Sequence, residues 1–204
     1  MIQEILPKIK NKRIILFGEI HGTKEIPIML SNFFKYLAKY EDFNLCLELS
    51  KEFQDIKLED ILPLAKKIGT SGLISGEYIE LIKEMPGNVK VFFIAPNTIK
   101  NQGEMEKGLA ENILKLINGK RTFAILGNIH ASKNRITLRN LDITPAGFLI
   151  KQKIKDKMYS ILFKAKGGEF FNNGIKRIEY NKDDSFDKNF DYIYELERVS
   201  PCSL

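Results

Sequence analysis

The sequence predicts an α/β fold: a mainly parallel central sheet flanked by helices, with antiparallel strands added in the C-terminal part. The main observation is four apolar runs, rich in β-branched and aromatic residues, at residues 13–17, 44–49, 89–95 and 122–126. Their apolar character is nearly continuous, as in strands buried on both faces, and does not alternate. Helical patterns separate the runs, and strand–helix–strand repetition builds a parallel sheet through right-handed crossovers.

The first helix is expected directly after the first strand. Five apolar residues there fall on one helical face: Ile26, Leu30, Phe33, Phe34 and Leu37. Thr23 is a candidate N-cap, and Pro27 lies early enough to be tolerated in the first turn. This helix links the first two strands.

Three further helices are expected before the fourth strand. Residues 53–68 and 77–85 have helical patterns between the second and third strands, and the glycine-rich loop 69–76 separates them. Residues 104–117 predict a helix that Asn118-Gly119 closes. Each helix therefore follows one strand and precedes the next, as a parallel sheet requires.

The pattern changes after residue 145. Strand-like runs at 158–163 and 192–197 flank turn signals at Gly167-Gly168 and at residues 172–174. We interpret this part as antiparallel strands appended to the sheet. Because no linker or repeat interrupts the chain, we expect one domain over residues 1–204.

The charge is spread along the chain. The net charge of +6 comes mostly from lysines interleaved with acids, and there is no arginine cluster or RNA-binding aromatic signature, so we expect no nucleic-acid partner. The densest patch is Lys151, Lys153, Lys155 and Lys157, whose alternation fits the solvated face of an edge strand.

Other features of the composition indicate the compartment. No apolar run approaches the roughly 20 residues that cross a bilayer, and the first residues contain no signal-peptide core, so we expect no membrane contact. Cys46 and Cys202 are isolated, which favours a reduced cytoplasmic setting. The sequence does not indicate an oligomeric state.

The only two histidines occupy matching positions. Each follows an apolar run that ends in Gly-x-x-His, at Gly18 to His21 and at Gly127 to His130. In an open α/β sheet, ligands bind outside the carboxyl ends of the strands. Both histidines are expected just past such an end, so the motif points to a site there.

Two carboxylates are expected at the same edge. Glu19 projects from the same side as His21 if the chain stays extended, and Glu48 follows the apolar end of the second strand. Glu19, His21, Glu48 and His130 suit Zn²⁺, Mn²⁺, Co²⁺ or Fe²⁺ as ligands. Alternatively, a carboxylate orients one histidine as a general base towards water, with no metal.

A purely structural role is the competing interpretation. In that case His21 and His130 cap strand ends by local hydrogen bonds, and Glu48 forms an ion pair with a lysine. Two histidines in matching motifs, with none elsewhere, favour the functional interpretation. A carboxylate after a buried apolar run is also costly unless it has a partner.

At these residues the chain resembles the Tiki/TraB, ChaN-like and erythromycin-esterase superfamily. The likeness rests on Gly-Glu-Ile-His-Gly at 18–22, Glu48 and Gly-Asn-Ile-His at 127–130, and continues weakly through 144–152, 166–171 and 191–203. Many relatives have an Arg-acid pair opening the helix before the second histidine strand. Here Glu106 takes the place of the acid, and Met105 stands where the arginine would be.

The resemblance implies several activities. Its branches range from metal-dependent peptide cleavage, through metal-independent ester hydrolysis, to haem binding. The first hypothesis is therefore a hydrolase of ester or amide bonds in a small-molecule or peptide substrate, with a metal optional. Asn128 is a further candidate at the site, and Glu25 and the loop 69–76 are candidates for the substrate mouth. The alternatives are an iron- or haem-binding protein with His21 as the ligand, and a member that has lost its chemistry with the Met105 substitution.

Overall fold

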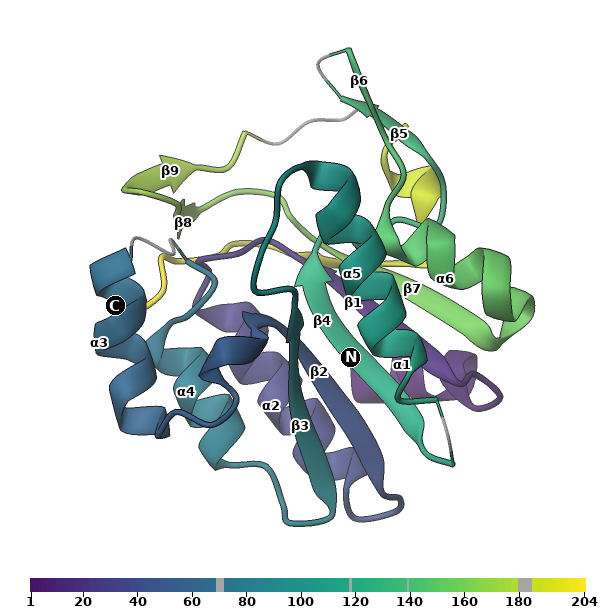
Figure 1. Cartoon of the computed structure of the whole chain (residues 1–204), viewed down its shortest axis with the longest axis horizontal. Helices are drawn as coiled ribbons and strands as arrows, with labels where there is room; N and C mark the ends of the chain where they lie inside the picture. The colour runs from purple at the N-terminus through teal and green to yellow at the C-terminus, as the bar shows by residue number, and fades with distance from the viewer. Residues whose placement is uncertain (69–71, 118, 139, 180–184) are drawn as a thin grey trace.

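A six-stranded parallel sheet forms the centre of the molecule. The computed structural model describes residues 1–68, 72–117, 119–138, 140–179 and 185–204 (Figure 1). The strand order is β10-β7-β1-β4-β2-β3, and every pairing between neighbours is parallel. The strands are β1 (Ile14–Glu19), β2 (Phe43–Ser50), β3 (Val89–Ala95), β4 (Arg121–Gly127), β7 (Met158–Ala165) and β10 (Tyr192–Leu196).

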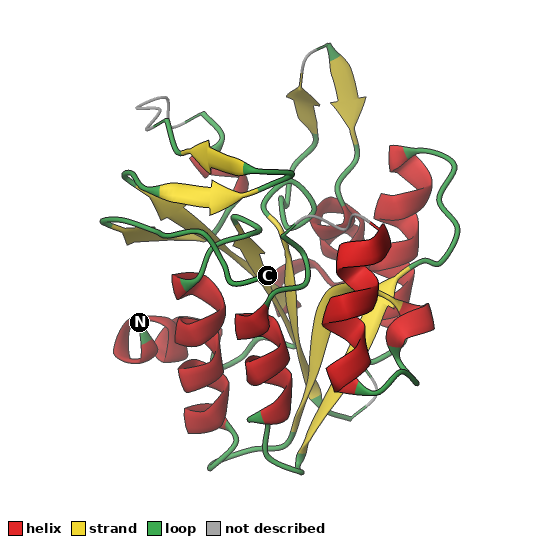
Figure 2. Ribbon diagram, turned by 90° about the vertical axis from the view of Figure 1, so that its left-hand side faces the viewer, coloured by secondary structure: helices red, strands yellow, loops and turns green. Residues whose placement is uncertain are grey.

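Helices cover both faces of this sheet (Figure 2). One apolar cluster joins a face of the sheet to α1 (Ile2–Ile9), α2 (Glu25–Leu37), α3 (Leu58–Ile68) and α4 (Gly76–Lys83). A second cluster joins the other face to α5 (Gln102–Leu114) and α6 (Ala146–Ile154). Short 3₁₀ helices occur at η1 (Lys51–Phe53), η2 (Lys155–Lys157) and η3 (Asp187–Asn189). The sequence-predicted α/β architecture is therefore confirmed.

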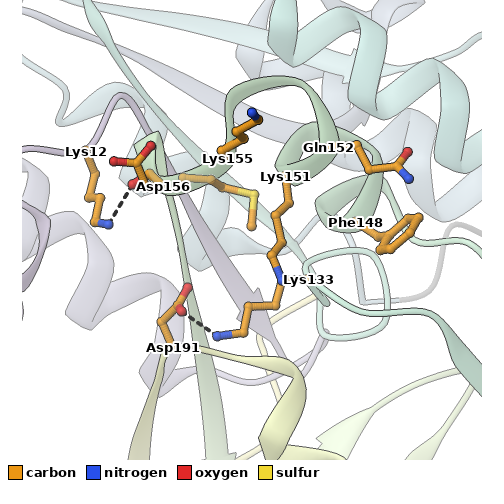
Figure 3. Close-up of a pocket in the computed structure, with 9 residues that line it drawn as sticks. Lys12, Lys133, Phe148, Lys151, Gln152, Lys155, Asp156 and Asp191 are labelled. Atoms are coloured by element: carbon orange, nitrogen blue, oxygen red, sulfur yellow. Dashed lines mark hydrogen bonds and ion pairs between the residues drawn. The ribbon is translucent and has the colours of Figure 1, made fainter.

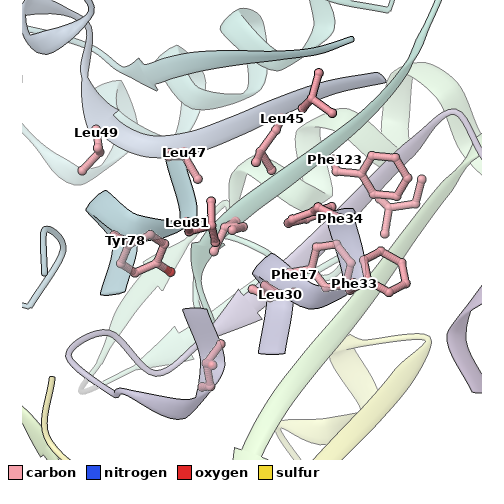
Figure 4. Packing of buried hydrophobic residues seen from close by; sticks show 14 of the residues in the cluster. Phe17, Leu30, Phe33, Phe34, Leu45, Leu47, Leu49, Tyr78, Leu81 and Phe123 are labelled. Carbon is pink, nitrogen blue, oxygen red and sulfur yellow. The ribbon is translucent and has the colours of Figure 1, made fainter. Parts of the chain in front are cut away.

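Aromatic packing fixes α2 against the sheet (Figure 4). Phe17 of β1 packs with Phe33 and Phe34 of α2 at ring-centroid distances of 5.7 Å, and Phe123 of β4 lies 5.7 Å from Phe34. All four rings are fully buried. Edge-to-face aromatic pairs of this kind add to the stabilisation from buried area. β1 and β4, which lead to the two histidine motifs, are thus held against α2 by buried aromatic rings.

The C-terminal part differs from the prediction in one respect. The runs at 158–163 and 192–197 are strands, but both join the central sheet as parallel members through β7 and β10. A helix precedes β7, and a long connection precedes β10. Each connection returns the chain to the amino edge of the sheet, so the next strand pairs in the parallel direction.

The antiparallel strands form two separate pairs. β5 (Ile136–Leu138) pairs with β6 (Leu141–Ile143), and β8 (Glu169–Phe171) pairs with β9 (Ile175–Arg177). Both pairs lie beyond the carboxyl ends of the central strands (Figures 1 and 2). They are short additions next to the candidate site, and they do not extend the central sheet.

The lysine-rich segment 151–157 is helical, so the edge-strand interpretation is wrong. It contains the end of α6 and all of η2. Ile150 is buried and Ile154 packs against the same cluster, which is the i, i+4 spacing of a helical face. The lysines at 151, 153 and 155 are exposed.

Helix boundaries differ in smaller ways. Lys24, not Thr23, is the N-cap of α2, because the Thr23 hydroxyl donates to the carbonyl of Ile20. The helix predicted from residue 53 begins at 58, and the helix predicted to residue 117 ends at Leu114. Asn118 lies outside the described residues. In the part of the chain that the structure describes, no helix is both long enough and apolar enough to span a bilayer.

Candidate functional site

The two histidine motifs meet at the carboxyl edge of the sheet. Glu19 ends β1 and lies opposite Gly127, which ends the neighbouring strand β4. His21 and His130 follow these ends by two and three residues. Because β1 and β4 are adjacent and parallel, their motifs lie side by side, as the sequence predicts.

Five side chains form a continuous array of carboxylates and imidazoles. Glu19 Oε1 lies 2.7 Å from His21 Nδ1, and Glu106 Oε1 lies 2.8 Å from His130 Nδ1. Glu48 stands between the imidazoles, with Oε2 3.6 Å from His21 Nε2 and Oε1 3.2 Å from His130 Nε2. We call these residues, Glu19–His21–Glu48–His130–Glu106, the His–Glu array. Each imidazole thus has a carboxylate at both ring nitrogens.

Glu48 reaches the array because β2 is irregular at its end. The register between β2 and β3 shifts between Leu47 and Ser50, and a shift of this kind re-aims the side chain within it. The backbone N–H of Gly127 donates to Glu48 Oε2 at 2.7 Å. Glu48 is therefore fixed by the chain as well as by His130, and it forms no lysine ion pair among the described residues.

Glu106 is a further member of the site. The sequence matches it to the acid of the relatives' Arg-acid pair, but it was not among the four predicted site residues. It projects from α5 and is almost fully buried. Gln102 Nε2 donates to its Oε1 at 2.6 Å, and the backbone N–H of Ala146 donates to its Oε2 at 2.8 Å. The i, i+4 spacing of Gln102 and Glu106 was a local signal, but only the fold shows that the helix lies over His130.

Gly127 leaves the space in which the imidazoles approach each other. A Cβ there would lie 2.8 Å from His21 Nε2 and 3.3 Å from His130 Cδ2. Gly22 is required by its backbone, since its φ is +78° and a Cβ would meet the Phe171 carbonyl oxygen at 1.9 Å. The carbonyl of Gly22 also accepts from the N–H groups of Phe171 and Cys202. The motif glycines therefore serve packing and turn geometry at the site.

The array keeps both histidines positively charged near neutral pH. Burial alone would lower the pKa of His21, but Glu19 and Glu48 raise it from 6.5 to about 10. Burial likewise opposes the charge of His130, and Glu48 and Glu106 raise its pKa to about 10. Burial would raise the pKa of Glu48, but the two imidazolium charges hold it well below its usual value. His21 is the more accessible imidazole, with 27% of its side chain exposed against 15% for His130.

Tyr78 of α4 lies near the Glu19 end of the array. Burial, followed by the charges of Glu19 and Glu48, raises the pKa of its phenol. Neither the Tyr78 hydroxyl nor Glu19 Oε2 has a hydrogen-bond partner among the described residues, although both atoms are buried. Sequence reasoning had no signal for Tyr78, which appears only as part of a helical pattern.

The donor types suit a divalent metal, but their arrangement does not hold one. In the described part of the chain, no three His, Cys, Asp or Glu side chains are grouped so as to bind a metal ion. Glu48 itself lies between His21 Nε2 and His130 Nε2, where a shared ion would have to lie. The same pairing does not favour haem, because a carboxylate already faces each nitrogen that would be an axial ligand.

The other candidates at the site have separate roles. The Glu25 carboxylate accepts from the N–H of Ser200 at 2.8 Å and so anchors the C-terminal segment. Asn128 lines a cavity of about 190 Å³ together with Ile20. Met105 is partly buried against the core cluster of α5 and α6 and brings no charge to the array. Residues 69–71 of the glycine-rich loop lie outside the described residues.

The clustered lysines lie away from the array. Lys12, Lys133, Lys151 and Lys155 line a cavity of about 510 Å³ with Phe148 and Asp191 (Figure 3). Lys12 precedes β1, Lys155 precedes β7 and Asp191 precedes β10, so this cavity lies towards the amino ends of the strands. It is therefore a different feature from the site at the carboxyl edge.

Solved structures share this fold. A succinoglycan biosynthesis protein matches with a TM-score of 0.71 and 12% identity, over 99% of this chain and 92% of its own. A protein from Bacillus cereus matches over the same shares, with a TM-score of 0.69 and 12% identity. A mutant of the erythromycin esterase EreC, in its open conformation, matches with a TM-score of 0.64 and 10% identity over 91% of this chain and 81% of its own. The chain therefore shares its fold with these three structures.

A haem-binding ChaN from Campylobacter jejuni also matches, with a TM-score of 0.45 and 14% identity over 79% of this chain. No family model and no curated protein matches the sequence. Identities of this size establish the fold, and the chemistry has to be argued from the array.

Proposed function

We propose that this protein is a hydrolase of ester or amide bonds in which His21 is the general base and Glu19 orients it. The observation that carries the proposal is the His–Glu array. Glu19 Oε1 holds His21 Nδ1 at 2.7 Å, while His21 Nε2 lies 3.6 Å from Glu48, longer than a hydrogen bond. His21 Nε2 is therefore the less tightly held nitrogen of the more exposed imidazole.

The reaction needs a neutral His21. Its Nε2 takes a proton from a water molecule, and the water oxygen attacks the carbonyl carbon of the substrate. The protonated imidazole then gives this proton to the leaving alcohol or amine as the carbonyl re-forms. The hydrogen bond from Nδ1–H to Glu19 keeps the proton on the nitrogen that faces away from the water.

His130 and Glu48 support this step from the other side. His130, between Glu48 and Glu106, is protonated at neutral pH, and its charge then keeps Glu48 ionised. Glu48 then stabilises the imidazolium that forms at His21. No member of this set needs a metal for its role, so the proposal includes none.

The raised pKa of His21 has a kinetic consequence. A base with a pKa of about 10 is mostly protonated at neutral pH, so only a small fraction of the protein is competent there. We expect kcat/KM to rise with pH through the neutral range and to level off near pH 10. The fold shared with an erythromycin esterase supports hydrolysis as the class of reaction, and identities of 10–12% support no specific substrate.

The test is a screen of the purified chain against p-nitrophenyl esters and p-nitroanilides at mildly alkaline pH. We expect His21→Ala to lower the rate on any substrate found by about 100-fold or more, the range for loss of a general base. Glu84→Gln is the control, because Glu84 forms an exposed ion pair with Lys35 outside the array. Hydrolysis by His21→Ala at the wild-type rate, or no hydrolysis of any ester or amide, would overturn the proposal.

A further inference from the structure

The β5–β6 hairpin has one apolar face. Its pairing places Ile136 opposite Ile143 and Leu138 opposite Leu141. Since side chains alternate along a strand, these four residues share one face. Leu138 and Leu141 are 44% and 68% exposed. An isolated two-stranded hairpin is only marginally stable in water, and its apolar face normally packs against something.

A cavity of about 550 Å³ lies against this face. Its walls come from the hairpin, from the start of α5 and from the segment after β4: Gln102, Gly103, Glu106, Ile129, Leu138, Leu141, Asp142, Ile143 and Thr144. Three of the four apolar hairpin residues are among them. A volume of this size is within the usual range of small-molecule sites, which are mostly apolar with a few polar groups.

The cavity adjoins the His–Glu array through Glu106. Glu106 lines it and also contacts His130 Nδ1 at 2.8 Å. Gln102, another wall residue, donates to Glu106 at 2.6 Å. Ile129 lines the cavity from the position directly before His130. A molecule in the cavity therefore lies against Glu106, the carboxylate that contacts His130.

We propose that this cavity binds the apolar part of the substrate, so that the protein prefers esters or amides with a medium-length acyl chain or an aromatic ring. The inference rests on the proposed function. The apolar group lies along Leu138, Leu141 and Ile143, and the carbonyl reaches back to His21 and His130. Each methylene that becomes buried increases kcat/KM by about threefold to fourfold.

The test has a binding arm and a kinetic arm. The binding arm titrates N-phenyl-1-naphthylamine, an uncharged apolar fluorescent probe, into the wild-type chain and into the double variant Leu138→Asn, Leu141→Asn. We expect the double variant to bind the probe about tenfold more weakly, because it loses two apolar contacts. Ile175→Asn is the matched control, since Ile175 is 63% exposed on the other hairpin, and it should bind as the wild type does.

The kinetic arm compares p-nitrophenyl acetate, butyrate and octanoate. We expect kcat/KM to increase at least about tenfold from acetate to octanoate in the wild type, and the double variant to lose this increase. Equal probe binding by the double variant, or wild-type hydrolysis without a preference for longer chains, overturns the inference and leaves the proposed function standing. Weaker probe binding without hydrolysis of any ester supports the apolar site and overturns the proposed function.

Discussion

Replacing His130 with glutamine should change how the stability of the fold depends on pH. In the folded chain the pKa of His130 is about 10, against 6.5 for an ordinary histidine. A group whose pKa is raised by folding contributes its full stabilisation below the lower value, and the contribution is lost as the pH rises through the higher one. His130 therefore stabilises the fold at about pH 6.5 and much less near pH 10.

The magnitude follows from the size of the rise. At about 1.4 kcal/mol for each pKa unit, an increase from 6.5 to about 10 corresponds to up to ~5 kcal/mol. His21 shares Glu48 with His130, so removal of one imidazole also changes the other, and their contributions do not add. We therefore expect His130 to account for about 2–5 kcal/mol of the decrease in unfolding free energy between about pH 6.5 and 10.

The assay is urea unfolding followed by circular dichroism at several pH values from about 6.5 to 9.5, for the wild type and His130→Gln. Lysines and tyrosines titrate in both proteins, so their effects cancel in the difference between the two curves. The wild type should lose at least about 2 kcal/mol more than the variant over this range. Parallel curves would refute the electrostatic account of the array.

Three further perturbations test other parts of the account. Gly22→Ala should lower the free energy of unfolding, measured with urea, by about 2–4 kcal/mol. The φ of Gly22 is +78°, and an added Cβ would overlap the Phe171 carbonyl. An unchanged urea midpoint would contradict the tight turn. Glu106→Gln should lower the pKa of His130 in an NMR titration, since a charged partner is lost; a pKa still near 10 would assign the shift to Glu48 alone. A metal chelator should leave hydrolysis unchanged, whereas a loss that Zn²⁺, Mn²⁺ or Co²⁺ restores would show that the metal-free mechanism is wrong.

The sheet and the meeting of the histidines were predictable from local patterns. Strands buried on both faces have continuous apolar runs, and the carboxyl ends of parallel strands meet at one edge. Glu19, His21, Glu48 and His130 therefore converge as predicted, although their chemical roles stay predictions. This convergence can be predicted once the strand ends are located, and in the two motifs a glycine followed by polar residues marks those ends.

Other features depend on tertiary packing. Glu106 reaches His130 only because α5 lies over the carboxyl edge, and no local pattern states that. The lysines at 151–157 alternate like an edge strand, yet Ile150 and Ile154 pack as a helical face against the core. β7 and β10 are parallel because the chain returns to the amino edge of the sheet before each of them. The turn signals near residues 167 and 174 did not reveal this return.

The apolar face of the β5–β6 hairpin was also missed. Ile136, Leu138, Leu141 and Ile143 look scattered in the sequence, because a turn separates the two pairs. Only the pairing register shows that they share one face beside the array.

The central claim is that His21, oriented by Glu19, is the general base. The most direct test compares two values: the pKa of His21 from an NMR titration, and the apparent pKa of kcat/KM on an ester that the protein hydrolyses. His130→Gln assigns the signals, because His21 is then the only histidine left. The account predicts that the two values agree near 10 in the wild type and that both fall in Glu19→Gln, which loses a charge that raises the pKa of His21. A kinetic pKa that stays unchanged while the NMR pKa of His21 falls would show that another group is the base.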